Sequence, residues 1–134
     1  MSEKILVTGG GGFIGRNLSE KLVELNNDVT IFDLYCPPQL LEITNIRFIK
    51  GNISNNSDIN KLTSYDFNII IHLASTASVP NAVEDPESDF FSTAYGTLKM
   101  LELAKEKKIN KFIYISTVSI YDTNNKMPLH EKSF

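Results

Sequence analysis

Several features that would assign the chain to a specialised class of protein are scarce or missing. The 134 residues include a single cysteine, Cys36, so no disulfide forms within the chain and a reducing compartment is expected. The two histidines, His72 and His130, do not stand at metal-ligand spacing from each other or from Cys36, so we expect no metal site. A net charge of −3, with 13 scattered lysine and arginine residues, disfavours nucleic acid and anionic membranes as partners.

Long hydrophobic runs are missing as well. A membrane-spanning helix needs about 20 apolar residues, and no apolar run here is longer than a few. The N-terminus enters a strand-like segment almost at once, without the apolar stretch of a secretory signal peptide. We therefore expect a cytoplasmic protein without a membrane partner. The length is that of one domain, large enough to bury a sizeable core.

The segment Val-Thr-Gly-Gly-Gly-Gly-Phe-Ile-Gly, which ends at Gly15, carries the clearest functional pattern. A short apolar run typical of a buried strand precedes it, and apolar residues at helical spacing follow it. Gly12 and Gly15 take the last two positions of a dinucleotide fingerprint, whose first glycine is either Gly9 or Gly10. In such a turn, backbone N–H groups and the positive end of a helix dipole meet a pyrophosphate.

An acidic residue favours this interpretation over a plain tight turn that only lets a helix pack on a strand. Asp33 ends the next predicted strand, 18 residues beyond Gly15. In dinucleotide-binding folds the acid that binds the ribose lies about 20 residues beyond the glycines. Strand, glycines, helix, strand and acid therefore occur in the expected order.

Strand-like and helix-like segments alternate along the whole chain. Strands are predicted at 4–7, 28–33, 46–50, 67–73 and 111–116, a short helix at 57–62 capped by Ser57, and a long helix after Pro86 with Phe91, Ala94, Leu98, Leu101 and Ala104 on one stripe. This alternation predicts an α/β fold, a doubly wound parallel sheet of the Rossmann type with five strands in the order 3-2-1-4-5. The ligand is expected at the C-terminal strand ends, between strands one and four.

The order of motifs resembles the N-terminal part of the extended short-chain dehydrogenase/reductase family. This family includes NAD-dependent nucleotide-sugar epimerases, dehydratases and decarboxylases, and the resemblance to UDP-glucose 4-epimerases and UDP-glucuronate decarboxylases is plain. The residues that carry it are Thr8 to Gly15, Asp33, Ile71 to Ala74, Asp85-Pro86, Gly96-Thr97, Met100-Leu101, Tyr114 to Thr117 and Ile120-Tyr121.

The resemblance implies NAD as the cofactor and assigns roles to individual residues. The NAD-binding residues that it implies are Gly9, Gly12, Phe13, Ile14, Gly15, Asp33, Leu34, Asn52, Ile53, Leu73, Ala74, Ser75 and Thr93. Asp33 would hold the adenosine ribose, and Asn52 and Ile53 would flank the adenine. Thr117 takes the catalytic Ser/Thr position, where it would hydrogen-bond a substrate hydroxyl or carbonyl; a strand-end residue that caps a turn is the simpler alternative.

Three positions depart from the family pattern. Asn52 replaces the usual Asp, which exchanges a carboxylate that only accepts hydrogen bonds for an amide that also donates them. Thr93 replaces an Asn, and Asp122 replaces a Gly. These departures indicate a divergent member of the family.

The resemblance implies an isomerase or lyase that acts by transient hydride transfer on a nucleotide sugar. It implies a UDP-linked substrate for the full-length protein and is compatible with a homodimer. The family's catalytic Tyr-x-x-x-Lys follows the fifth strand, and the sequence ends at Phe134 before that helix. We therefore expect residues 1–134 to be an incomplete NAD-binding domain without a substrate domain.

One Tyr-x-x-x-Lys is present, Tyr95 to Lys99, but it precedes the fifth strand, and we interpret it as structural. Two alternatives to an enzyme stay open at this point. One is a non-catalytic NAD(P)-binding sensor or regulatory protein on the same fold, and the other is a short binding module of five strands.

Overall fold

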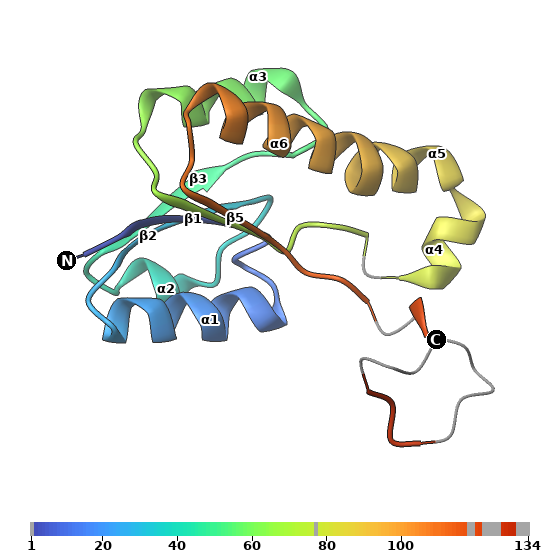
Figure 1. Cartoon of the computed structure of the whole chain (residues 1–134), viewed down its shortest axis with the longest axis horizontal. Coiled ribbons are helices and arrows are strands. Elements are labelled where there is room, and N and C mark those ends of the chain that lie inside the picture. The colour runs from blue at the N-terminus through green and yellow to red at the C-terminus, as the bar shows by residue number, and fades with distance from the viewer. Residues whose placement is uncertain (1, 77, 118–119, 122–126, 131–134) are drawn as a thin grey trace.

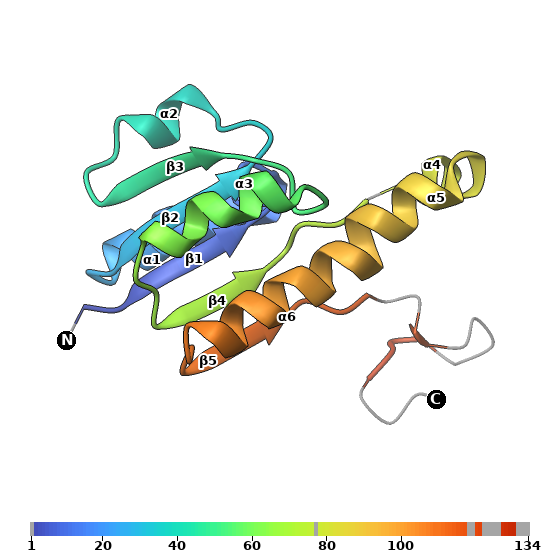
Figure 2. The same cartoon turned by 90° about the horizontal axis from the view of Figure 1, so that it is seen from above.

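Five parallel strands form the centre of the computed structural model, which describes residues 2–76, 78–117, 120–121 and 127–130. The strands are β1 (Lys4–Thr8), β2 (Asp28–Asp33), β3 (Ile46–Lys50), β4 (Ile69–His72) and β5 (Lys111–Tyr114). Their order across the sheet is β3-β2-β1-β4-β5, which Figure 2 shows from above. The predicted α/β class, the parallel pairing and the strand order are confirmed.

Helices cover both faces of the sheet (Figure 1). Helices α1 (Phe13–Glu24) and α2 (Pro38–Leu41) lie on one face, and α3 (Asn56–Asn60) and α6 (Gly96–Glu106) lie on the other. A 3₁₀ turn, η1, extends α3 over Lys61–Ser64, while α4 (Val79–Glu84), α5 (Pro86–Asp89) and the π-helical segment η2 (Phe90–Tyr95) lead into α6. The fold is thus a three-layer sandwich, as a doubly wound sheet requires.

Alternate residues of each strand supply two separate cores. Leu6, Phe32 and Ile70 belong to the core beneath α3 and α6, where Met100 and Leu103 pack. The neighbouring strand positions belong to the opposite core, which includes Ile5, Val7, Ile31 and Ile71 and is covered by Leu18, Leu22 and Leu40 from α1 and α2. Because side chains alternate along a strand, a strand covered on both faces must be apolar throughout, which explains the uninterrupted apolar runs.

The long helix after Pro86 forms, but the stripe predicted for it is mostly wrong: Ala104 packs against the core, whereas Phe91 and Ala94 are exposed. Leu98 and Leu101 are about half exposed, and the side buried on the sheet carries Gly96, Met100 and Leu103 instead. A Cβ on Gly96 would lie 2.6 Å from Cδ1 of Ile53, so only the glycine-bearing face fits this closely on the core. The π-helical turn of η2 also breaks the regular spacing on which the stripe was counted.

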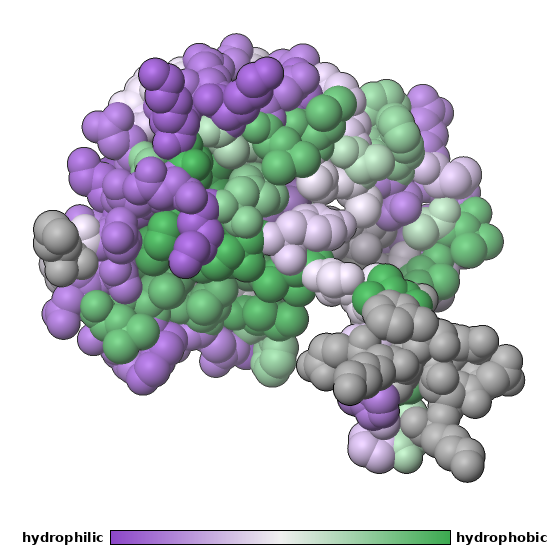
Figure 3. Space-filling model, in the orientation of Figure 1, coloured by the Kyte–Doolittle hydropathy of each residue, from purple (hydrophilic) through white to green (hydrophobic). Residues whose placement is uncertain are grey.

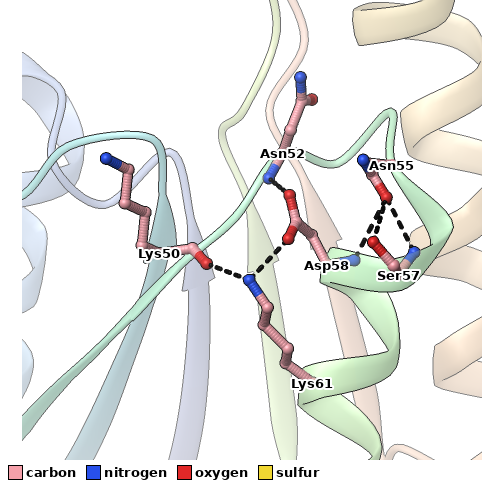
Figure 4. A network of polar contacts seen from close by, with 6 residues as sticks. All are labelled: Lys50, Asn52, Asn55, Ser57, Asp58 and Lys61. Atoms are coloured by element: carbon pink, nitrogen blue, oxygen red, sulfur yellow. Dashed lines mark hydrogen bonds and ion pairs between the residues drawn. The ribbon is translucent and has the colours of Figure 1, made fainter.

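The N-cap of α3 also differs from the prediction. Asn55, rather than Ser57, caps this helix: its Oδ1 accepts hydrogen bonds from the backbone N–H groups of Ser57 (2.9 Å) and Asp58 (3.4 Å), as Figure 4 shows. The helix begins at Asn56, one residue before the predicted start, and Asn is as good an N-cap as Ser.

The strand β5 lies at an edge of the sheet and is largely exposed. Its residues are exposed except for the half-buried Phe112, in contrast to β1, where only the first residue is exposed. Figure 3 shows apolar residues across the middle of this side of the molecule, where Figure 1 places β5. Within the described ranges, no helix is both long and apolar enough to cross a membrane.

Candidate functional site

A cleft of about 1020 Å³ opens at the C-terminal ends of the strands. All the residues that the sequence analysis assigned to a site line it: Gly9, Gly12, Phe13, Ile14, Gly15, Asp33, Leu34, Asn52, Ile53, Leu73, Ala74, Ser75, Thr93 and Thr117. The chain leaves β1 toward one face of the sheet and leaves β4 toward the other. Doubly wound parallel sheets bind ligands in the crevice between two such strands.

The glycine turn forms the floor of the cleft, and its first glycine is Gly9. Gly9 has a φ of 70°, and a Cβ there would lie 2.7 Å from the backbone nitrogen of Ala74. The other candidate, Gly10, does not line the cleft, and a Cβ on it would lie 2.8 Å from the side chain of Ile31 in the core. Both positions need glycine, but only Gly9 places its backbone at the cleft.

The start of α1 presents backbone donors to the same cleft. Gly12 is the N-cap, no side chain caps the helix, and no acidic residue stands in the first turn. The first N–H groups of a helix have no partner within it, and the helix dipole adds positive potential there. Gly15 lets this helix approach, because a Cβ on it would lie 2.2 Å from the Gly9 carbonyl oxygen. The result is a site suited to an anion.

Asp33 is fixed beside the glycine turn by two backbone donors. Its Oδ2 accepts a hydrogen bond from the Gly11 N–H at 2.9 Å, and its Oδ1 accepts one from the Tyr35 N–H at 3.3 Å. Gly11 has no room for a side chain, because a Cβ would lie 2.0 Å from the Tyr35 carbonyl oxygen. Gly11 lies between the fingerprint positions, so the glycine spacing assigns it no role, yet its N–H joins the turn to the carboxylate.

A polar network holds Asn52 just beyond the C-terminal end of β3 (Figure 4). Asp58 accepts a hydrogen bond from the Asn52 N–H at 3.0 Å and pairs with Lys61 at 2.6 Å, and Lys61 also donates to the Lys50 carbonyl at 3.0 Å. The hydrogen bond from Lys61, with that from the Asn52 N–H, lowers the pKa of Asp58. The Asn52 Oδ1 accepts from the Ser54 N–H at 2.8 Å, so its amide nitrogen is the group that this turn leaves for a ligand.

The wall of the cleft opposite the glycine turn is built from the segment after β4 and from η2. The Thr76 N–H donates to Thr93 Oγ1 at 3.4 Å, and the Thr76 and Ser92 hydroxyl groups are hydrogen-bonded. Thr93 in turn donates to Asp89 at 3.2 Å. Thr76, Ser92 and Asp89 line the cleft as well, and no motif in the sequence singled them out.

Thr117 stands on the cleft in the segment after β5, whereas the Tyr95–Lys99 pair does not line it. The Tyr95 hydroxyl donates to Asn56 Oδ1 at 3.3 Å, on the surface between α3 and the long helix. Lys99 pairs with Glu102, and this hydrogen bond raises the pKa of Lys99. A lysine that activates a tyrosine needs to share a site with its substrate, so this geometry favours the structural interpretation of the pair.

Comparison with known proteins decides the family. The model of the NAD dependent epimerase/dehydratase family matches residues 5–134. The chain belongs to this family.

Relatives of this epimerase/dehydratase chain include enzymes with solved structures. The chain is 30% identical, over 143 aligned residues, to a bifunctional UDP-glucose 4-epimerase and UDP-xylose 4-epimerase of Pisum sativum, covering 97% of this chain and 41% of that protein. An epimerase of Methanothermobacter thermautotrophicus has a TM-score of 0.87 and 31% identity, over 98% of this chain and 40% of that one.

A second solved structure is the UDP-glucose 4-epimerase of Bifidobacterium longum in complex with NAD⁺ and UDP. It has a TM-score of 0.85 and 27% identity, and covers 97% of this chain and 42% of that one. The chain thus spans about two fifths of the length of these relatives. The family is NAD-dependent by description, which confirms the cofactor predicted from the resemblance.

The part of the chain that the structure describes holds no group of three or more His, Cys, Asp or Glu side chains that could bind a metal ion. The polar groups of the cleft are backbone N–H groups, hydroxyl groups, one amide and two carboxylates, Asp33 and Asp89. Such a set suits hydrogen bonds to ribose and phosphate groups.

Proposed function

We propose that the cleft binds NAD and that the chain is the NAD-binding part of a nucleotide-sugar epimerase or dehydratase, an isomerase or lyase. One observation carries the proposal: Asp33 is fixed against the turn that presents Gly9, Gly12 and Gly15 to the same cleft. A ribose acceptor and a pyrophosphate site therefore adjoin in one depression, as a dinucleotide requires.

The residues present fit the adenosine side of this cofactor. Each Asp33 oxygen accepts one backbone N–H and keeps further acceptor capacity for the ribose hydroxyl groups. The first turn of α1, at Phe13 and Ile14, would donate backbone N–H groups to the pyrophosphate. Asn52 and Ile53 would flank the adenine, with the Asn52 amide as a hydrogen-bond donor.

The chemistry proposed for the whole protein is a reversible oxidation at the sugar. NAD, when bound, supplies a hydride acceptor. Thr117 would hydrogen-bond the reacting hydroxyl or carbonyl group, and UDP-linked sugars are the proposed substrates because the relative of Pisum sativum is a UDP-glucose and UDP-xylose epimerase. The proton acceptor of such a reaction is not Tyr95, which lies away from the cleft.

Titration with NAD and NADP tests the binding proposal. The fixed Asp33 carboxylate would face the 2′-phosphate of NADP, and like charges at close range repel, so NAD should bind more tightly. Asp33→Ala should weaken NAD binding and remove the preference. Asp66→Ala is the matched control, because Asp66 is an exposed carboxylate at the other end of the sheet and outside the cleft. Equal affinity for the two dinucleotides in the unmutated protein would refute the assignment.

An assay on UDP-hexoses and UDP-glucuronate tests the catalytic proposal. These 134 residues should bind NAD weakly and turn over no substrate, whereas a longer protein that carries this chain and a following Tyr-x-x-x-Lys helix should be active. Loss of a general acid–base typically costs about 10²–10⁴-fold in rate. In the active protein, Thr117→Ala should lower turnover and leave NAD affinity nearly unchanged. Equal activity of the short and the long protein would contradict the proposal.

A further inference from the structure

A chain of hydrogen bonds runs beneath the cleft, from the segment after β4 to the long helix. The Ala74 N–H donates to Thr8 Oγ1 at 3.4 Å, and Thr8 Oγ1 lies 2.6 Å from His72 Nδ1. On the other side of the ring, His72 Nε2 lies 3.0 Å from Thr97 Oγ1, which donates to the Thr93 carbonyl at 2.6 Å. Thr8 and His72 are almost fully buried, so water does not replace these partners.

On a neutral ring, only one arrangement of protons satisfies all four contacts. Thr97 has a single hydroxyl proton, which goes to the Thr93 carbonyl, so Thr97 must accept a proton from His72 Nε2. Thr8 accepts from the Ala74 N–H and donates its own proton to His72 Nδ1. The neutral ring therefore carries its proton on Nε2.

The surroundings of the ring support the neutral form. Burial lowers the pKa of His72 to about 4. The aromatic rings of Phe112 and Tyr114 in β5 each lie 5.9 Å from the imidazole, and its two hydrogen-bond partners are uncharged threonines. A protonated ring would also leave the Thr8 hydroxyl proton without an acceptor in this chain of hydrogen bonds.

Both ends of this hydrogen-bonded chain lie at the cleft. Ala74 and Thr93 line it, whereas Thr8, His72 and Thr97 do not. Thr93 is also joined to Thr76 at the surface of the same wall. Two sets of hydrogen bonds therefore hold this wall, and the buried set passes through the imidazole of His72.

We propose that His72 is a positioning residue for the dinucleotide site: through Thr8 and Thr97 it holds Ala74 and Thr93 in the places from which they line the cleft. The inference rests on the proposed NAD-binding function. It assigns His72 neither a proton-transfer role nor a contact with the ligand, because the ring does not line the cleft.

Substitutions that remove or restore the two hydrogen bonds of the ring test the proposal by NAD titration. Loss of one or two hydrogen bonds should weaken NAD binding about tenfold in His72→Leu and in Thr97→Val. His72→Gln should keep affinity within about threefold, because an amide also offers one acceptor and one donor. Thr30→Val is the matched control: Thr30 is a buried threonine of β2 outside the cleft and outside this hydrogen-bonded chain.

Nuclear magnetic resonance of the ring nitrogens gives a readout that needs no ligand. The ¹⁵N signals that vanish in His72→Gln should show a protonated Nε2 and an unprotonated Nδ1. Hydrogen exchange at the Ala74 amide should accelerate in His72→Leu but not in His72→Gln. A proton on Nδ1, or unmutated NAD affinity in folded Thr97→Val, would overturn the proposal.

The NAD titrations and the ligand-free measurements distinguish failure of the proposed NAD binding from failure of the positioning role of His72. If the unmutated protein binds no NAD, the proposed function fails, and the ring tautomer and the Ala74 exchange rate still decide whether His72 positions this wall. If His72→Leu does not fold, Thr97→Val decides the effect on binding, since Thr97 lies on the partly exposed side of α6 and Val has nearly the same shape.

Discussion

The two halves of the sheet enclose the cleft in different ways. In the half made by β1 and β2, the glycine turn and Asp33 are held by backbone contacts so close that a Cβ at Gly9, Gly11 or Gly15 would overlap backbone atoms. In the half made by β4 and β5, hydroxyl groups tie the wall, and the edge strand and α6 leave apolar side chains exposed. We call the half with the glycine turn the rigid half, because its backbone contacts are so close, and the half that carries Thr117 the open half, because it leaves apolar side chains exposed.

The same substitution in each half should measure this difference. Ile31 in β2 is fully buried, whereas Ile113 in β5 is 37% exposed. Truncation of a buried isoleucine leaves a cavity, so Ile31→Ala should lower the free energy of unfolding by about 2–5 kcal/mol. Ile113→Ala should lower it by about 1 kcal/mol, because the site is already partly solvated. Urea denaturation measures both, and equal losses would show that the two halves are equally well packed.

The buried histidine should make the β4 half sensitive to acid. The pKa of His72 is about 4 in the folded chain, against 6.5 for an unperturbed histidine, so the unfolded chain binds the proton first as the pH falls. The contribution of the buried, neutral His72 to the free energy of unfolding is complete above about pH 6.5. As the pH falls toward 4 this contribution is lost, by about 3 kcal/mol in all. The pKa of Asp58 is lowered from 3.8, so the stability that its ionised carboxylate contributes is lost only below the pH range in which His72 acts. Unfolding measured at several pH values should show a flatter curve for His72→Gln, and an unchanged slope would contradict this burial effect.

Much of the β1–β2 half could be predicted from the sequence, because its function depends on residues close together in the chain. The glycine spacing, the strand end at Asp33 and the apolar run of β1 are local patterns. The Gly11–Asp33 hydrogen bond and the choice between Gly9 and Gly10 depend on how the turn meets β2 and the segment after β4, and spacing does not encode that contact.

The other half was harder to predict because its contacts join residues far apart in sequence. Thr8 and His72 are 64 positions apart, and Thr76 reaches Ser92 and Thr93 across two short helices. The long helix has apolar residues on more than one side, and the close fit of Gly96 on Ile53 decided which side is buried. Only the folded sheet brings these residues together.

Two glycines of the turn offer a finer test of the rigid half. A Cβ on Gly15 would lie 2.2 Å from the Gly9 carbonyl oxygen, whereas on Gly12 it would meet the same atom at 3.3 Å. Gly15→Ala must push α1 away from the turn, and overpacking of this kind costs about 1–3 kcal/mol. Gly12→Ala should cost less and keep more NAD affinity. Parallel unfolding and NAD titrations compare the two, and a larger loss in Gly12→Ala would refute the role of close approach at Gly15.

One buried group in the same half should improve stability when it is removed. Ser19 of α1 is fully buried, and its Oγ has no hydrogen-bond partner within the described part of the chain. Ser19→Ala removes an unsatisfied hydroxyl and raises helix propensity, so the free energy of unfolding should rise by about 1 kcal/mol. Ser57→Ala serves as a comparison at an exposed helical serine. A loss of stability in Ser19→Ala would mean that the hydroxyl has a partner.

The smallest effect is expected on the outer surface of the open half, at Lys99. Its ammonium group pairs with Glu102 and lies 5.8 Å from the Tyr95 ring, and both residues are outside the cleft. Exposed ion pairs contribute little to stability. Lys99→Ala should therefore leave NAD affinity within about twofold of the unmutated value, since no binding contact is removed. Tyr95→Ala should act through stability alone, because it loses packing against Phe91 and the hydrogen bond to Asn56. A large loss of NAD affinity in folded Lys99→Ala would instead place a functional group on this surface and overturn the structural interpretation of the pair.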